Sequence, residues 1–234
     1  MPSTIAENLA AIRERMRQAC LRAGRSTEAV RLVGVTKTVP IERVREGVEA
    51  GITILGENYV QEARRKAEAL SDLDVTRHFI GHLQSNKAKQ VLECCDLIET
   101  VDRESLARSL GLLAEKRGKK VPVLIQVNVG DEESKSGVAP EGLPALFKAV
   151  SAIEGLDVLG LMTLPPYLED PEMVRPFFRK LRLLLDEIRG CAARPERLVE
   201  LSMGMSHDFE AAIEEGATLV RIGTALFGTR PARL

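Results

Sequence analysis

Short apolar runs rich in β-branched residues recur along this chain, and an amphipathic stretch separates most of them from the next. The runs lie at 32–35, 52–55, 78–80, 97–98, 123–129, 158–162, 198–201 and 219–222. Runs of this kind are typical of buried strands, whereas the stretches between them follow the helical period. Roughly eight strands, each followed by a helix or loop, predict a (β/α)₈ TIM barrel. A doubly wound open sheet has the same alternation and is the main alternative.

An additional helix is predicted before the first run. Thr4 and Glu7 form a capping-box pattern, and apolar residues then recur at helical spacing. Gly24 is placed to end this helix, since glycine is favoured just beyond a helix C-terminus. The expected fold is therefore an α/β barrel with an extra N-terminal helix.

Two later helices have recognisable starts. Asp102 is the predicted N-cap of a helix that ends near Gly118. Asp170 followed by Pro171 starts another, because proline is favoured at the first helical position. No linker, low-complexity tract or shift in composition marks a second domain, so we expect residues 1–234 to form one domain.

Composition argues against several classes of function. Lys and Arg total 33 against 34 Asp and Glu, and aromatic residues make up 3%, so neither a basic surface nor a stacking platform for nucleic acid is indicated. The cysteines form no C-x-x-C pair and histidines are few, which disfavours a zinc site. No run has membrane-spanning length, and the charged N-terminus does not resemble a signal peptide. We expect a cytoplasmic protein.

Lys37 directly follows the first apolar run, at the strand end where barrel active sites assemble. A lysine there often covers apolar surface with its stem while the ammonium group reaches water. Inside a barrel mouth, by contrast, desolvation favours the neutral amine, which attacks an aldehyde to form an imine. The residue type by itself leaves both roles open.

Small polar residues follow the last two runs. Ser202, Gly204 and Ser206 come after the seventh run, and Gly223 and Thr224 after the eighth. In barrels these two loops, together with a helix N-terminus, commonly bind a phosphate group. Each residue also suits an ordinary turn or helix cap. Their occurrence after two adjacent strands favours a phosphate site.

Several short segments occur in a fixed order along the chain: V-T-K-T at 35–38, G-E-N-Y-V-Q-E at 56–62, H-F-I-G-H-L-Q-S-N-K at 78–87, K-S-G at 135–137, G-L-M-T at 160–163, L-S-M-G-M-S-H-D at 201–208 and R-I-G-T-A-L-F-G at 221–228. In their order and spacing these segments resemble the pyridoxal-phosphate homeostasis proteins, which are single-domain relatives of the alanine racemase N-terminal barrel. The resemblance covers nearly the whole chain. Thr36, where related sequences often have serine, is a conservative difference.

The resemblance implies that the barrel binds pyridoxal 5′-phosphate. By that likeness Lys37 forms the Schiff base, while Ser202 and Ser206 hold the phosphate together with Gly223 and Thr224. The other residues that the resemblance places around the cofactor are Asn58, His82, Met162 and Arg221.

Arg221 has two possible positions under the resemblance, near the pyridine nitrogen or near the phosphate. An arginine beside the nitrogen disfavours its protonation, which weakens the ring as an electron sink and limits carbanion chemistry. An ion pair with Glu200, Glu214 or Glu215 would account for the same residue on structural grounds. The sequence leaves these positions open.

Two classes of function follow. One is an amino-acid racemase-like enzyme; the other is a carrier that buffers the cofactor in vitamin B6 homeostasis and affects amino-acid metabolism indirectly. Racemisation needs an acid/base group on each face of the substrate, and Lys37 serves only one. The resembling racemases use a tyrosine and a further β domain, whereas this chain continues only to Leu234, and neither Tyr59 nor Tyr167 is clearly placed over the cofactor. We expect a carrier with little or no turnover.

A Schiff-base aldolase acting on a sugar phosphate is a more distant alternative, because no acid/base partner for the lysine is recognisable. As partners we expect the cofactor itself and pyridoxal-phosphate-dependent apoenzymes as transient recipients, with no nucleic acid and no membrane. The chain is expected to be a monomer or a weak homodimer.

Overall fold

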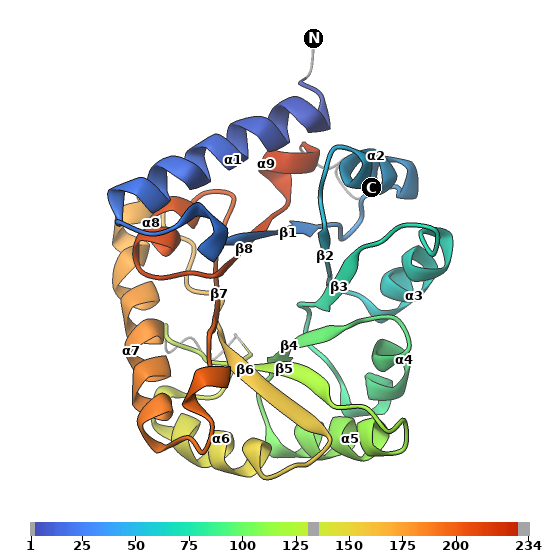
Figure 1. Ribbon diagram of the computed structural model, residues 1–234, viewed down its shortest axis with the longest axis vertical. Coiled ribbons are helices and arrows are strands. Elements are labelled where there is room, and N and C mark those ends of the chain that lie inside the picture. The colour runs from blue at the N-terminus through green and yellow to red at the C-terminus, as the bar shows by residue number, and fades with distance from the viewer. Residues whose placement is uncertain (1–2, 131–135, 229–234) are drawn as a thin grey trace.

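The computed structural model describes residues 3–130 and 136–228, and within these ranges eight strands form a closed parallel barrel (Figure 1). The strands are β1 (Arg31–Val35), β2 (Ile54–Glu57), β3 (Thr76–Phe79), β4 (Leu97–Val101), β5 (Val121–Gln126), β6 (Leu156–Met162), β7 (Glu200–Met205) and β8 (Leu219–Ile222). They pair in chain order, and β1 also pairs with β8. This closure confirms the barrel and excludes the open sheet.

A helix follows each strand and packs on the outside of the barrel, as Figure 1 shows. These helices are α2 (Ile41–Glu49), α3 (Val60–Ala69), α4 (Ala88–Leu92), α5 (Glu104–Glu115), α6 (Leu143–Ser151), α7 (Arg175–Cys191), α8 (Phe209–Glu214) and α9 (Thr224–Phe227). None of the helices in the part of the chain that the structure describes is both long and apolar enough to cross a bilayer.

The predicted N-terminal helix is confirmed as α1 (Ile5–Arg22), which lies across the outer ring against α8 and α9. Its capping box is present: the Glu7 amide donates to Thr4 Oγ1, and the Thr4 amide donates to the Glu7 carboxylate at 2.8 Å. Gly24 follows the helix with φ 64°, the left-handed conformation that glycine adopts most readily. Asn8 Nδ2 ties α1 to α9 by donating to the Leu226 carbonyl oxygen at 3.0 Å.

The expected helix start at Asp102 is wrong by one residue. Arg103 is the N-cap of α5, and no side chain caps it. The Asp102 carboxylate instead accepts a hydrogen bond from Arg103 Nη1 at 2.5 Å. Asp170 does cap a start, but of a 3₁₀ turn (Pro171–Val174) that leads into α7.

Two strands begin two residues later than their apolar runs predict. The runs at 52–55 and 198–201 include Ile52 and Leu198, which are buried but precede β2 and β7. Apolar character alone therefore predicted the starts of β2 and β7 too early in the sequence. The shift matters most for β7, because its carboxyl end lies at Met205 and not near residue 201.

The inside of the barrel is layered. One interior layer consists of apolar side chains: Val33, Ile54, Leu97, Leu124, Met162 and Leu219. Further along the strands, buried charged and polar residues follow, among them His78, Glu99, Ser202 and Arg221. The polar interior residues lie between this apolar layer and the carboxyl end of the barrel.

Candidate functional site

A cavity of about 310 Å³ opens at the carboxyl end of the barrel. Six of the predicted site residues line it: Lys37, Asn58, Ser206, Arg221, Gly223 and Thr224. They come from the ends of β1, β2, β7 and β8, which are far apart in the sequence but adjacent in the closed sheet. This is the barrel face on which active sites assemble.

The strand period explains why Lys37 lies inside the barrel mouth. Successive side chains of a strand point to opposite faces, so every second residue faces inward. On β1, Val33 belongs to the interior apolar layer and Val35 lines the cavity, followed by Lys37. On β8, the same alternation brings Arg221 and Gly223 to the cavity wall.

Asn58 lies at the end of β2 with its carbonyl group against Gly81. A Cβ on Gly81 would come within 2.1 Å of the Asn58 carbonyl oxygen, so this close approach requires glycine. The side-chain Oδ1 of Asn58 is buried, and within the described residues no group donates a hydrogen bond to it. An unsatisfied buried acceptor beside a cavity is suited to a ligand that supplies the missing donor.

The rim on the β7–β8 side consists of small groups. Gly223 is the N-cap residue of the short helix α9, and Thr224 is its exposed first residue. The Ser206 hydroxyl accepts a hydrogen bond from the Ala225 amide at 3.3 Å. Hydroxyls and backbone amides at a helix start are the groups that bind phosphate oxygens in barrels of this kind.

Arg221 forms the floor of the cavity and is only 3% exposed. Its Nη1 donates to the Ser202 hydroxyl at 2.6 Å, and its Nη2 donates to the Thr163 carbonyl oxygen at 2.7 Å. Burial lowers the pKa of Arg221, while the negative charges of Glu99 and Asp208 oppose that shift. These contacts hold the guanidinium in one orientation beneath the cavity.

Glu99 is the buried anion that accompanies this arginine. Its Oε1 lies 2.7 Å from His78 Nδ1, and its Oε2 accepts a hydrogen bond from the Ser202 hydroxyl at 2.5 Å. Burial raises the pKa of Glu99, but the His78 contact and the Arg221 charge outweigh it, so the pKa lies below its usual value. Arg221 therefore belongs to an internal network and pairs with none of Glu200, Glu214 and Glu215.

Three predicted residues are not brought to the cavity. Ser202 lies deeper in the barrel than the cavity, where its hydroxyl contacts Glu99. Since β7 continues to Met205, Ser206 lies beyond the end of the strand and Ser202 does not. Met162 is fully buried in the interior apolar layer. His82 does not line the cavity; its side chain is mostly exposed, with Nδ1 3.1 Å from Ser136 Oγ. Lys135 of the K-S-G segment lies outside the described residues.

Tyr167 and His207, to which the sequence assigned no site role, lie in the cavity wall. Their rings are in contact, with centroids 5.4 Å apart, and His207 Nε2 lies 2.8 Å from the Glu169 carbonyl oxygen. Tyr167 is 70% exposed. No periodic pattern could have located it, because it follows Pro165 and Pro166 in an irregular segment after β6. Val35 and Ile80 also line the cavity, and the alternation of side chains along a strand could have identified them.

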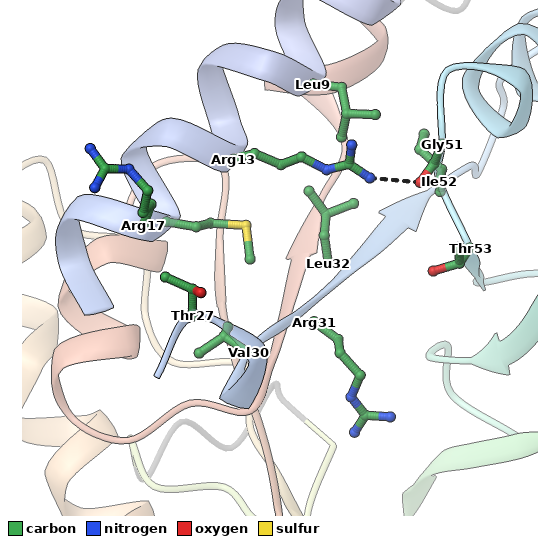
Figure 2. Close-up of a pocket in the computed structure, with 11 residues that line it drawn as sticks. Leu9, Arg13, Arg17, Thr27, Val30, Arg31, Leu32, Gly51, Ile52 and Thr53 are labelled. Atoms are coloured by element: carbon green, nitrogen blue, oxygen red, sulfur yellow. Dashed lines mark hydrogen bonds between the residues drawn. The ribbon is translucent and has the colours of Figure 1, made fainter. Parts of the chain in front are cut away.

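A second hollow lies between α1 and the starting ends of β1 and β2, away from this site (Figure 2). Its arginines already have partners: Arg13 donates to the Gly51 carbonyl oxygen, Arg17 pairs with Glu14, and Arg31 pairs with Glu200. Figure 2 shows the Arg13 bond bridging the hollow. Since its cations are engaged and barrel chemistry takes place at the other end, we do not assign it the function.

The fold and the lysine-containing mouth define a barrel of the alanine racemase type. The family described as alanine racemase, N-terminal domain, matches residues 7–231. The structure of alanine racemase from Clostridium difficile in complex with cycloserine aligns with a TM-score of 0.76. The alignment covers 98% of this chain and 60% of that one at 14% identity, which establishes a common fold alone.

Relatives of matching length are more similar. Pyridoxal phosphate homeostasis proteins of Aquifex aeolicus and Pseudomonas aeruginosa are 53% and 48% identical, covering 96% and 97% of this chain and 97% and 96% of theirs. PipY of Synechococcus elongatus, a structure with PLP bound, has a TM-score of 0.84 at 36% identity, covering 96% of this chain and 100% of that chain. The chain therefore belongs to the pyridoxal phosphate homeostasis protein family.

Proposed function

We propose that this protein binds pyridoxal 5′-phosphate in the cavity at the carboxyl end of the barrel and holds it as a Schiff base on Lys37. The observation that carries the proposal is that Lys37 shares one cavity with Ser206, Gly223 and Thr224. An amine and a set of phosphate-binding groups are the two features that the cofactor requires. The PLP-bound structure of PipY, 36% identical to this chain, supports the assignment.

The cavity fits the cofactor in size and polarity. Its volume of about 310 Å³ is at the lower end of the range typical for small-molecule sites, which suits a single-ring ligand. Ser206 and the amides around Gly223 are suited to the phosphate. The buried, unsatisfied Oδ1 of Asn58 would accept a hydrogen bond from a ligand donor.

The bound cofactor would supply an aldehyde carbon conjugated to an electron-withdrawing ring. The neutral amine of Lys37 would attack this carbon and form a C=N bond, and the carbonyl oxygen would leave as water. Ser202 and Thr163 hold Arg221 in the floor of the cavity, away from the phosphate-binding residues at the rim. Arg221 would therefore face the ring of the cofactor and not its phosphate. An arginine beside the pyridine nitrogen would keep it unprotonated and restrict carbanion chemistry.

This arrangement favours a carrier over an efficient enzyme. Thr224 is exposed and Lys37 only half-buried, so water would reach the mouth of the cavity. We propose that the protein acts in the cytoplasm in vitamin B6 homeostasis, as one unit over residues 1–234 and as a monomer or weak homodimer. It would buffer the reactive aldehyde, pass it to apoenzymes and affect amino-acid metabolism indirectly.

Borohydride reduction of the protein loaded with pyridoxal 5′-phosphate, followed by peptide mass mapping, tests the proposal. We expect one pyridoxyl adduct per chain on the Lys37 peptide, and loss of this adduct with the visible absorbance band in Lys37→Ala. Lys148→Ala, which changes an exposed lysine on α6, is the matched control and should load normally. A loaded wild-type protein with Lys37 unmodified would refute the assignment.

A second candidate, a racemase-like enzyme, is favoured by one observation. Tyr167 lines the same cavity as Lys37 and is in ring contact with His207, so a phenol is available on the wall of the site. Racemisation requires an acid/base group on each face of the substrate. Exchange of the alanine α-proton for solvent deuterium by the loaded protein would distinguish this candidate from a carrier.

A further inference from the structure

Lys66, on α3, is a lysine whose side chain is only 2% exposed. Its Nζ donates a hydrogen bond to the Thr36 carbonyl oxygen at 2.5 Å. It also lies 3.2 Å from Glu57 Oε2 and 3.3 Å from Glu62 Oε2. The ammonium group is thus bound by two carboxylates and by the backbone of the residue that precedes Lys37.

The two carboxylates contact the loop as well. The Thr36 hydroxyl donates to Glu57 Oε1 at 2.5 Å, and the Thr38 amide donates to Glu62 Oε2 at 2.8 Å. Both sequence neighbours of Lys37 are therefore attached to one network of charged side chains from β2 and α3. The Lys37 side chain extends into the cavity from between these two attachments.

The backbone at this loop is in an unfavourable conformation. Thr38 has φ 62°, a value that β-branched residues rarely adopt. Such conformations persist where surrounding contacts determine them, and they cluster at functional sites. The hydrogen bond from the Thr38 amide to Glu62 is a contact that holds this conformation.

Stability alone does not account for the network. Removing charges from water costs free energy that their mutual attraction repays only in part, and apolar residues of similar volume often stabilise a protein equally well. The side chains of Glu57 and Lys66 are each only 2% exposed. Lys66 and Glu57 form directional hydrogen bonds with the Thr36 carbonyl and hydroxyl. Apolar side chains in their place could not form these bonds.

We propose that Lys66, Glu57 and Glu62 are positioning residues, which hold Thr36 and Thr38 so that the Lys37 amine is presented to the aldehyde of the cofactor. This rests on the proposed function of Lys37. The network touches neither the cavity nor the reacting atoms, so it acts only through the loop. A misplacement of about 1 Å at a reacting group can cost on the order of 100-fold in rate.

Glu62 provides the sharpest test, because its side chain is partly exposed and its replacement leaves the Lys66–Glu57 pair intact. Glu62→Ala removes the acceptor for the Thr38 amide, whereas Glu62→Gln keeps an oxygen in the same place. We expect Glu62→Ala to slow imine formation with pyridoxal 5′-phosphate at least about tenfold and Glu62→Gln to restore it. In the cofactor-free protein, hydrogen exchange of the Thr38 amide should be faster in Glu62→Ala only.

Glu215→Gln is the control for the loss of an ion-paired carboxylate elsewhere in the protein. Glu215 pairs with Arg175, Arg179 and Arg182 and lies before β8, at the end of the barrel opposite the cavity. This variant should form the imine at the wild-type rate. Lys66→Met is the second test variant and should load as slowly as Glu62→Ala if it folds.

Two failures are distinguishable. If wild-type protein forms no adduct on Lys37, the proposed function is wrong. If wild-type protein forms it and Glu62→Ala forms it at the same rate with unchanged Thr38 exchange, the positioning role is wrong. If Lys66→Met does not fold, the comparison of Glu62→Ala with Glu62→Gln still tests the positioning role.

Discussion

Arg221 Nη1 donates to the Ser202 hydroxyl at 2.6 Å, and that hydroxyl donates in turn to Glu99 Oε2 at 2.5 Å. One buried serine thus connects a buried cation to a buried anion inside the barrel. The hydroxyl serves as acceptor for one and donor for the other, so both charges keep a hydrogen-bond partner away from water. Ser202 therefore supports the floor of the site from within.

Ser202→Ala should destabilise the fold by about 1–3 kcal/mol, because it leaves a guanidinium N–H and a carboxylate oxygen without this partner. Chemical denaturation would measure the loss, with Ser109→Ala on α5 as the control. If Ser202 held the phosphate instead, the variant would keep its stability and lose affinity for pyridoxal 5′-phosphate more than for pyridoxal.

Ser206→Ala should show the opposite behaviour. Ser206 lines the cavity beside Gly223 and Thr224, and hydrogen bonds to charged groups contribute more than neutral ones. We expect affinity for pyridoxal 5′-phosphate to fall about 10- to 100-fold, with little change for pyridoxal, which lacks the phosphate. Equilibrium titration by absorbance measures both. Equal losses for the two ligands would rule out a phosphate contact.

Tyr167→Phe separates the carrier from the racemase-like candidate. In a carrier the phenol is not needed for proton transfer, so we expect slow α-proton exchange of alanine in the wild type and the same rate in the variant. Tyr59→Phe, which changes the exposed tyrosine at the start of α3, is the matched control. Rapid exchange that disappears only in Tyr167→Phe would favour the enzyme.

The ion-pair cluster of Glu215 predicts a specific pH dependence of stability. Burial raises the pKa of Glu215, but the Arg179 hydrogen bond and the charges of Arg179, Arg182 and Arg175 outweigh it, so the folded-state pKa lies below 4.5. The ionised form is therefore favoured by folding. Its contribution is fully present above pH 4.5 and is lost as the pH falls through the lower folded-state value.

Glu215→Gln should accordingly be less stable than wild type at pH 7, by on the order of 2 kcal/mol. The difference in free energy of unfolding should shrink below about pH 4.5. Urea denaturation of both proteins across this range measures it. A difference that stays constant down to pH 3 would contradict the assignment.

Much of the fold follows from local patterns. The alternation of apolar runs with amphipathic stretches predicted the barrel, and Thr4 with Glu7 predicted the start of α1. The position of Lys37 after a buried run predicted its place at the carboxyl end of β1. These features depend on residues close together in the chain, where propensity and periodicity act directly.

The errors arose where a boundary depends on packing. An apolar residue such as Leu198 is buried whether or not it belongs to the strand, so β7 was placed too early. Because β7 extends to Met205, Ser202 lies within the strand and not beyond its end, so its hydroxyl is buried in the interior beside Glu99. Met162 and His82 were likewise named from the motif, without knowledge of which way each side chain points.

The sequence by itself determined the number and order of the structural units and the lysine at the mouth of the barrel, because both are encoded in short-range periodicity. Only the tertiary structure decided that Lys66 reaches the Thr36 carbonyl and that Tyr167 joins Lys37 in one cavity. Contacts of that kind form when the sheet closes and brings distant strands and loops together. Their energies depend on burial and geometry, which no local pattern specifies.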